Sequence, residues 1–144
     1  MDKLSLPAVL DSLAELRRYA RDAAARAGID ADRSYQLQLA VDEIATNIIS
    51  YGYKDAAPSA AIAIHGVITA DALVVTLEDQ APAFDPRGRQ LPDAADLARP
   101  LEERGIGGLG IYLAIQGVDR FDYRREGGRN LNIFEMRRDH GTAH

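Results

Sequence analysis

The chain has 144 residues, of which 47% are hydrophobic and 27% charged, with a net charge of −5 and no cysteine. This is the composition of a globular protein and the length of one domain, so we expect a single domain over residues 1–144. The lack of cysteine excludes disulfides, thiolate metal sites and cysteine nucleophiles. An acidic chain with no basic run is expected to bind neither nucleic acid nor an anionic membrane directly. No apolar segment approaches the roughly 20 residues of a membrane span, so we expect a cytoplasmic protein.

The N-terminal part predicts a short strand and an amphipathic helix. Residues 3–6 are a candidate edge strand that Pro7 would end. From Asp11 to Ala27, apolar residues recur at three- and four-residue spacings, and Gly28 is the expected stop signal of this helix. The outer face of the helix is basic and carries Arg17, Arg18, Arg21 and Arg26. Such a face is either solvated or a docking surface for a partner.

A second helix is expected from about residue 35 to residue 50, with Ser34 as its N-cap. Its apolar stripe consists of Leu37, Val41, Ile44, Ile48 and Tyr51. Glu43 and Asn47, four residues apart, lie on one line at the shoulder of this stripe, where we expect them to be neither buried nor fully solvated. An amide oxygen suits Mg²⁺, and a carboxylate one turn away can accept the proton of an attacking hydroxyl. Simple solvation is the alternative for such a pair taken alone.

Residues 61–68 and 73–78 are rich in β-branched and aliphatic side chains and predict an antiparallel hairpin. Asp79 ends the second strand, where its carboxylate could accept a hydrogen bond from an exocyclic amine such as that of adenine. The alternative is an ordinary aspartate at a strand end. Residues 79–108 lose periodicity, with at most a helical turn at 94–98. An irregular segment of this length inside a compact domain is usually functional.

Four glycines within residues 105–110 precede a short helix expected at 111–115. Glycines let backbone N–H groups approach an anion, and a helix N-terminus adds its positive dipole end, so this cluster suits a di- or triphosphate. A glycine-rich hinge is the alternative. Residues 119–125 and 130–137 predict a second hairpin, followed by a loose tail over 139–144. Three helices and about five mostly antiparallel strands predict a two-layer α/β sandwich with the helices on one face of the sheet.

The order of these features resembles the GHKL superfamily of ATP-binding domains, which includes gyrases and histidine kinases. The most specific segment is Val-Asp-Glu-Ile-Ala-Thr-Asn-Ile-Ile-Ser-Tyr-Gly-Tyr at 41–53, and the likeness is strongest to bacterial anti-sigma-factor serine/threonine protein kinases. The resemblance implies the Bergerat ATP-binding fold, with ATP and Mg²⁺ as cofactors. It also implies phosphorylation of an anti-sigma-factor antagonist and sequestration of a sigma factor. A non-catalytic, nucleotide-gated binding module is the alternative, and a homodimer is left open.

The resemblance also implies roles for the matched residues. Glu43 would be the general base toward the substrate hydroxyl, and Asn47 would ligate Mg²⁺. Asp79 would bind the adenine amino group, with Ala83 in the same loop. The remaining nucleotide-binding candidates are Arg104, Gly105, Gly107, Gly108, Leu109 and Gly110. The last three would hold phosphates through backbone N–H groups, Gly105 and Gly107 would let the lid fold over, and Arg104 is a candidate for the γ-phosphate.

The loop after Asp79 departs from the superfamily pattern. Members often carry Asp-x-Gly-x-Gly here, whereas this chain has Ala81 and Ala83 at the glycine positions. Alanine disfavours positive φ. We therefore expect Pro82 to re-route the loop while Asp79 keeps its place.

Overall fold

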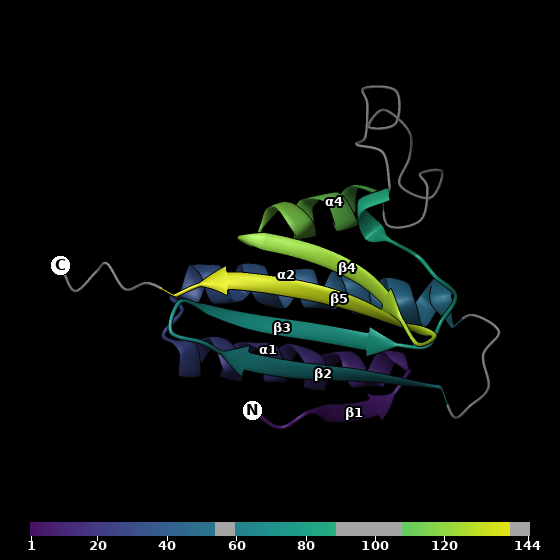
Figure 1. Cartoon of the computed structure of the whole chain (residues 1–144), viewed down its shortest axis with the longest axis horizontal. Coiled ribbons are helices and arrows are strands. Elements are labelled where there is room, and N and C mark those ends of the chain that lie inside the picture. The colour runs from purple at the N-terminus through teal and green to yellow at the C-terminus, as the bar shows by residue number, and fades with distance from the viewer. Residues whose placement is uncertain (54–59, 89–107, 139–144) are drawn as a thin grey trace.

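The computed structural model describes residues 1–53, 60–88 and 108–138. Figure 1 shows two layers in this part of the chain, a sheet in front and helices behind it. The five strands are β1 (Leu4–Pro7), β2 (Ala61–Ile68), β3 (Ala72–Asp79), β4 (Arg120–Glu126) and β5 (Arg129–Arg137). They form one antiparallel sheet in the order β1-β2-β3-β5-β4. The predicted two-layer sandwich is confirmed, and both predicted hairpins are present.

The helical layer consists of α1 (Leu13–Ala27), α2 (Ala31–Asn47) and α4 (Gly108–Gln116). Short helical turns lie at η1 (Leu10–Ser12), η2 (Ile48–Gly52) and η3 (Pro86–Gly88). The small buried face of α1, which includes Ala20, Ala23 and Ala24, packs against α2, β2 and β3, whereas α4 packs on α2. Gly28 ends α1 as predicted, in the left-handed conformation with φ 77°.

The start of α2 differs from the prediction. The helix begins at Ala31, and Asp30 is its N-cap, accepting a hydrogen bond from the Arg33 backbone N–H at 2.9 Å. Ser34 is therefore not the cap but a buried residue of the first helical turns, where its Oγ accepts a bond from Gln38. Aspartate and serine are equally good caps, so the sequence alone could not choose between them.

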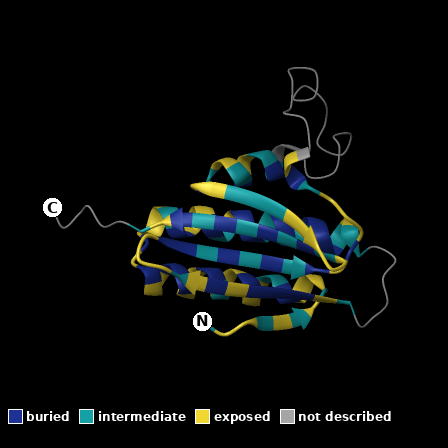
Figure 2. Ribbon diagram, in the orientation of Figure 1, coloured by how far each residue is buried: buried dark blue, intermediate teal, exposed yellow. Residues whose placement is uncertain are grey.

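The inward face of the sheet changes character along β3 and β5. At one end it is apolar, with Leu73, Val75 and the pair Phe134 and Met136 fully buried against the helices. At the other end the same face carries buried polar groups, namely Asp79, Asn130 and Asn132. Figure 2 shows the buried residues of these two strands as an alternating dark blue series. Buried polar groups need hydrogen-bond partners, so this end of the sheet face is a candidate place for a bound ligand.

Some expectations lie outside the described residues, namely the helical turn at 94–98 and the C-terminal tail at 139–144. No helix in residues 1–53, 60–88 or 108–138 combines the length and the apolar character needed to cross a membrane. The turn between β4 and β5 has Gly127 and Gly128 at φ 57° and 77°, a conformation that side chains rarely adopt.

Candidate functional site

A cavity of about 220 Å³ opens at the polar end of the sheet, between the C-terminal part of α2 and the loop after β3. Its lining comes from three stretches that are far apart along the chain. These are Ile44, Asn47, Ile48, Tyr51 and Gly52; Asp79, Ala81, Pro82, Ala83, Phe84 and Pro86; and Asn130 and Asn132. The cavity therefore brings together Asn47, Asp79 and Ala83, three of the residues predicted from the sequence.

Three buried side-chain atoms have no hydrogen-bond partner within the described part of the chain, and all three belong to residues that line this cavity. They are Asn47 Nδ2, Asp79 Oδ2 and Asn132 Oδ1. A buried polar group without a partner costs about 1–3 kcal/mol. One unpaired donor and two unpaired acceptors around a single cavity indicate a site for a ligand that has polar atoms of both kinds.

Asp79 is held firmly by one of its two oxygens. Its side chain is 2% exposed, and Oδ1 accepts hydrogen bonds from the Ala81 backbone N–H at 2.9 Å and from Asn130 Nδ2 at 2.8 Å. Burial raises the pKa of Asp79, and these two bonds together with the nearby Arg125 offset only part of that rise. The second oxygen, Oδ2, is left as an acceptor for a donor from a ligand.

The loop after Asp79 is built without glycine. None of the described residues other than glycine has a positive φ, so Ala81 and Ala83 adopt ordinary backbone conformations. The Ala81 methyl group packs against Gly52, where a Cβ would lie 3.0 Å from it. Arg125 and Asn130 donate hydrogen bonds to the Ala81 carbonyl oxygen at 2.8 Å and 3.0 Å. Packing and side-chain hydrogen bonds thus fix a loop for which related domains often use glycine.

Asn47 and Glu43 lie one helical turn apart on α2 but in different environments. The expectation that both would be only partly buried is wrong for Asn47, which is 8% exposed, and right for Glu43. The helix continues after Asn47 as a wider π-type turn, η2, which brings its residues out of α-helical phase. Tyr51, expected on the apolar stripe, is for this reason 51% exposed at the cavity.

Glu43 faces the first turn of α4. A Cβ on Gly110 would overlap with the Glu43 carboxylate, so only glycine permits this close approach. Burial raises the pKa of Glu43, and the neighbouring Asp42 raises it further. A carboxylate whose pKa is shifted toward neutrality is suited to accept a proton. Gly108 and Leu109 form the start of the same helix, whereas Arg104, Gly105 and Gly107 lie outside the described residues.

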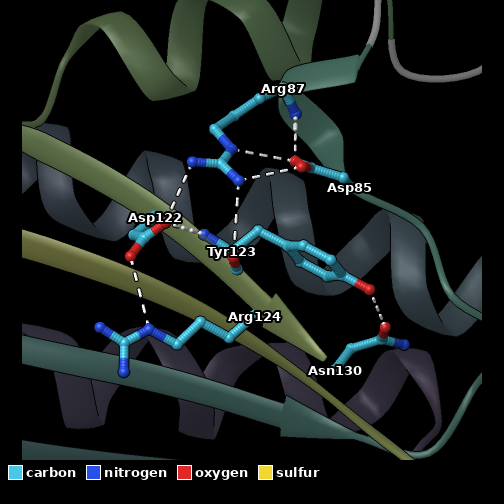
Figure 3. A network of polar contacts seen from close by, with 6 residues as sticks. All are labelled: Asp85, Arg87, Asp122, Tyr123, Arg124 and Asn130. Carbon is cyan, nitrogen blue, oxygen red and sulfur yellow. Dashed lines mark hydrogen bonds and ion pairs between the residues drawn. The ribbon is translucent and has the colours of Figure 1, made fainter. Parts of the chain in front are cut away.

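A charged network joins the segment around Asp85 and Arg87 to β4, as Figure 3 shows. The Arg87 guanidinium lies between Asp85 and Asp122 and forms hydrogen bonds of 3.0 Å to each. Because these side chains are substantially exposed, each ion pair adds little to the stability of the fold. Their effect is to anchor the segment that carries Pro86, which lines the cavity.

The sequence reasoning missed Asn130 and Asn132. Both occupy inward-facing positions of β5, in the same period-two series as Phe134 and Met136. An asparagine at a core position of a strand is unusual, because its amide needs partners there. The alternation of residues along β5 was a signal in the sequence for these two asparagines. Its use required knowing which face of the strand is buried.

The sequence profile of the histidine kinase-like ATPase domain matches residues 6–137. The chain therefore belongs to this family, and the resemblance drawn from the order of its motifs is confirmed. This chain is 28% identical over 130 residues to the serine-protein kinase RsbW of Bacillus cereus strain AH187, and the alignment covers 90% of this chain and 80% of the relative. To the serine-protein kinase RsbW of Halalkalibacterium halodurans it is 24% identical over 127 residues, covering 88% of this chain and 76% of the relative.

Two solved structures share the fold. The structure of the RsbU and RsbW domains of Rv1364c from Mycobacterium tuberculosis matches with a TM-score of 0.58 and 16% identity, over 95% of this chain and 32% of that one. The histidine kinase domain of a blue-light activated histidine kinase from Erythrobacter litoralis EL346 matches with a TM-score of 0.56 and 17% identity, over 92% of this chain and 62% of that one. At these identities the likeness establishes the fold alone.

Proposed function

We propose that this chain binds ATP in the cavity at the end of β3 and transfers its γ-phosphoryl group to a serine or threonine hydroxyl of a protein. The observation that carries the proposal is that three buried polar atoms without partners in the described part of the chain all belong to residues that line one cavity. Family membership and relatives named as serine-protein kinases support the same activity. A cavity of about 150 Å³ admits a benzene ring, so the 220 Å³ here suits a flat aromatic base.

The base would lie between apolar side chains and present its amino group to Asp79. Ile44 and Ile48 on one side and the Ala81–Pro82 segment on the other supply apolar walls. Asp79 Oδ2 is an unpaired acceptor, which is the partner that an exocyclic amino group requires. Ala83 lines the mouth of the same cavity.

Asn47 fits the role of a magnesium ligand. Its carboxamide lines the cavity, and the carboxamide oxygen is a ligand of the kind that Mg²⁺ prefers. Its buried Nδ2, which has no partner among the described residues, can only donate a hydrogen bond. In the same part of the chain no three His, Cys, Asp or Glu side chains converge, so a bound ion would draw its other ligands from phosphates and water. When bound, Mg²⁺ would neutralise phosphate charge and orient the triphosphate.

Glu43 would act as the general base. Its carboxylate would accept the proton of the attacking hydroxyl as the new oxygen–phosphorus bond forms and the bond to the β-phosphate bridging oxygen breaks, which releases ADP. The backbone N–H groups at the start of α4, from Gly108 to Gly110, would hold phosphate oxygens, as helix N-termini do. Arg104, Gly105 and Gly107 would complete the phosphate site from the lid.

The protein substrate would be an anti-sigma-factor antagonist, and the second partner a sigma factor. The support is the resemblance to anti-sigma-factor kinases together with the RsbW relatives, which match most of this chain. Phosphorylation of the antagonist would then decide which of the two partners the chain holds.

Radiolabelled ATP and a candidate antagonist test the proposal. We expect label on the antagonist with the wild-type chain and a loss of about 10²–10⁴-fold in the transfer rate with Glu43→Gln, while ATP binding measured by calorimetry is retained. Wild-type chain that binds ATP but transfers no label would favour the non-catalytic binding module. Failure to bind ATP at all would refute both functions.

A further inference from the structure

The side-chain amide of Asn130 lies between Asp79 and two donors from β4. On one side its Nδ2 donates to Asp79 Oδ1 at 2.8 Å and to the Ala81 carbonyl oxygen at 3.0 Å. On the other side its Oδ1 accepts from the Tyr123 hydroxyl and from the Arg125 guanidinium, the latter at 3.0 Å. Figure 3 shows the Tyr123 hydroxyl directed at the Asn130 amide.

This arrangement defines which way the amide faces. Asparagine is a donor at Nδ2 and an acceptor at Oδ1, and here the acceptors lie on one side and the donors on the other. Rotating the amide by half a turn would place Oδ1 against the acceptors and Nδ2 against the donors. Arg125 also donates to the Ala81 carbonyl oxygen at 2.8 Å, so it holds the loop and the amide at once.

The orientation of Asn130 determines what Asp79 can offer a ligand. Oδ1 of Asp79 accepts hydrogen bonds from Asn130 and from the Ala81 N–H. These two bonds favour an unprotonated Oδ1. Oδ2 then remains a buried acceptor without a partner among the described residues, in a side chain that lines the cavity. An acceptor at this point binds an amino group and repels a carbonyl oxygen.

We infer that Asn130, anchored from behind by Arg125 and Tyr123, is the positioning residue that keeps Asp79 as an acceptor, so that the cavity selects a 6-aminopurine over a 6-oxopurine nucleotide. This inference rests on the proposed function. It assigns the selection to contacts between β4, β5 and the loop after Asp79 that the motifs used for the resemblance do not include.

The neighbouring arginine offers a matched control. Arg124 and Arg125 are adjacent on β4 and face opposite sides of the sheet, since Arg124 pairs in register with Leu131 and Arg125 with Asn130. Arg124 forms an ion pair with Asp122 on the outer face and does not line the cavity. Replacing either arginine by methionine removes the donors and leaves a chain of similar length.

The experiment compares the affinities of the full chain for ATP and for inosine triphosphate, which differ at the 6-position of the purine, by calorimetry. We expect the wild type to prefer ATP, and Asn130→Asp and Arg125→Met each to lower the ATP-to-inosine-triphosphate affinity ratio by about tenfold or more. Arg124→Met should leave the ratio unchanged. Arg125→Lys, which keeps a donor, should restore most of it.

The outcomes separate the inference from the function on which it rests. Equal losses for both nucleotides in Asn130→Asp and Arg125→Met would show a merely structural role and overturn the inference, as would a wild type without preference. Wild-type chain that binds neither nucleotide would overturn the proposed function and this inference with it. If Asn130→Asp fails to fold, the ratio for Arg125→Met decides, because that side chain is largely exposed.

Discussion

At the scale of single residues, the contact between Glu43 and Gly110 couples a candidate catalytic group to the start of a helix. A second contact of the same kind lies further along the same pair of helices, where Gly117 abuts the side chain of Gln36. In both places a Cβ would displace the far end of a flexible side chain, which a folded protein can accommodate. The two glycines therefore distinguish a local effect on Glu43 from a general effect on helix packing.

We predict that Gly110→Ala lowers the rate of phosphoryl transfer by about tenfold or more, because the new methyl group displaces the Glu43 carboxylate. Gly117→Ala, which displaces Gln36 instead, should leave the rate within about twofold of the wild type. Transfer rates of the two variants, with thermal unfolding to confirm that both are folded, measure the difference. Equal losses in both would mean that the packing of α4, not the position of Glu43, matters.

At the scale of elements, α2 shows how far local sequence rules reach. Its apolar stripe predicted the buried positions Leu37, Val41 and Ile44. Its Glu–Asn spacing predicted two candidate site residues, of which Asn47 lines the cavity and Glu43 lies against the first turn of α4. The start of the helix was misplaced because Asp30 and Ser34 are equally good caps. The exposure of Tyr51 follows from the π-type turn, a feature for which the sequence carries no local signal.

The N-cap correction can be tested directly. Asp30→Ala should lower the free energy of unfolding by about 1 kcal/mol, because the Arg33 backbone N–H loses its partner. Ser34→Ala should cost less than half as much, since alanine suits a helix interior and only one hydrogen bond, from Gln38, is lost. Urea denaturation of the two variants measures both values. The reverse order would reinstate Ser34 as the cap.

The loop after β3 and the turn η2 pack closely against each other at Ala81 and Gly52. We predict that Gly52→Ala weakens ATP binding by about tenfold, because its methyl group would press on Ala81 and push the cavity wall inward. The double variant Gly52→Ala with Ala81→Gly should recover most of the affinity. Calorimetric titration of the two single variants and the double variant gives the coupling. Additive losses would show that the two positions act independently.

At the scale of the whole molecule, the strand order and the register were beyond the sequence. The hairpins β2–β3 and β4–β5 could be predicted from their turns, but the pairing of β3 with β5 joins residues more than fifty positions apart. That pairing places Asp79 opposite Asn130 and so creates the polar end of the sheet. Asp79 and Asn47 could be found from the sequence because they sit in local motifs. Asn130 and Asn132 could not, because their role depends on long-range pairing.

A ligand that binds in the cavity and pairs with the buried polar atoms would stabilise the whole domain. We predict that Mg·ATP at about 100 times its dissociation constant stabilises the fold by about 2.7 kcal/mol, a rise of about 10 °C in the melting temperature. The rise should shrink as the pH falls below neutral. The pKa of Asp79 is raised by burial, so its acceptor becomes protonated at a higher pH than an exposed aspartate. Thermal shift against pH measures this trend.

The sign of this pH effect follows mainly from the burial of Asp79, which raises its pKa. The hydrogen bonds from Asn130 and the Ala81 N–H and the charge of Arg125 lower this pKa, whereas the charge of Glu78 raises it slightly. The charge of Asp79 in turn helps to raise the pKa of Tyr53, the residue that follows η2. In the free protein the raised pKa means that stability is lost as the pH rises through it, because the buried charge has no donor at Oδ2. An amino group on a ligand supplies that donor, so binding favours high pH. Asp79→Asn should remove this component, and a persistent trend in that variant would assign it to the nucleotide.

The polar end of the sheet has a consequence for how fast the protein is degraded in a cell. Three buried groups without partners are expected to make the ligand-free domain open more often at this corner, and proteases cleave chains in their opened form. Bound ligand closes that route by mass action. The abundance of the protein should therefore follow the supply of its ligand, independently of any change in its synthesis.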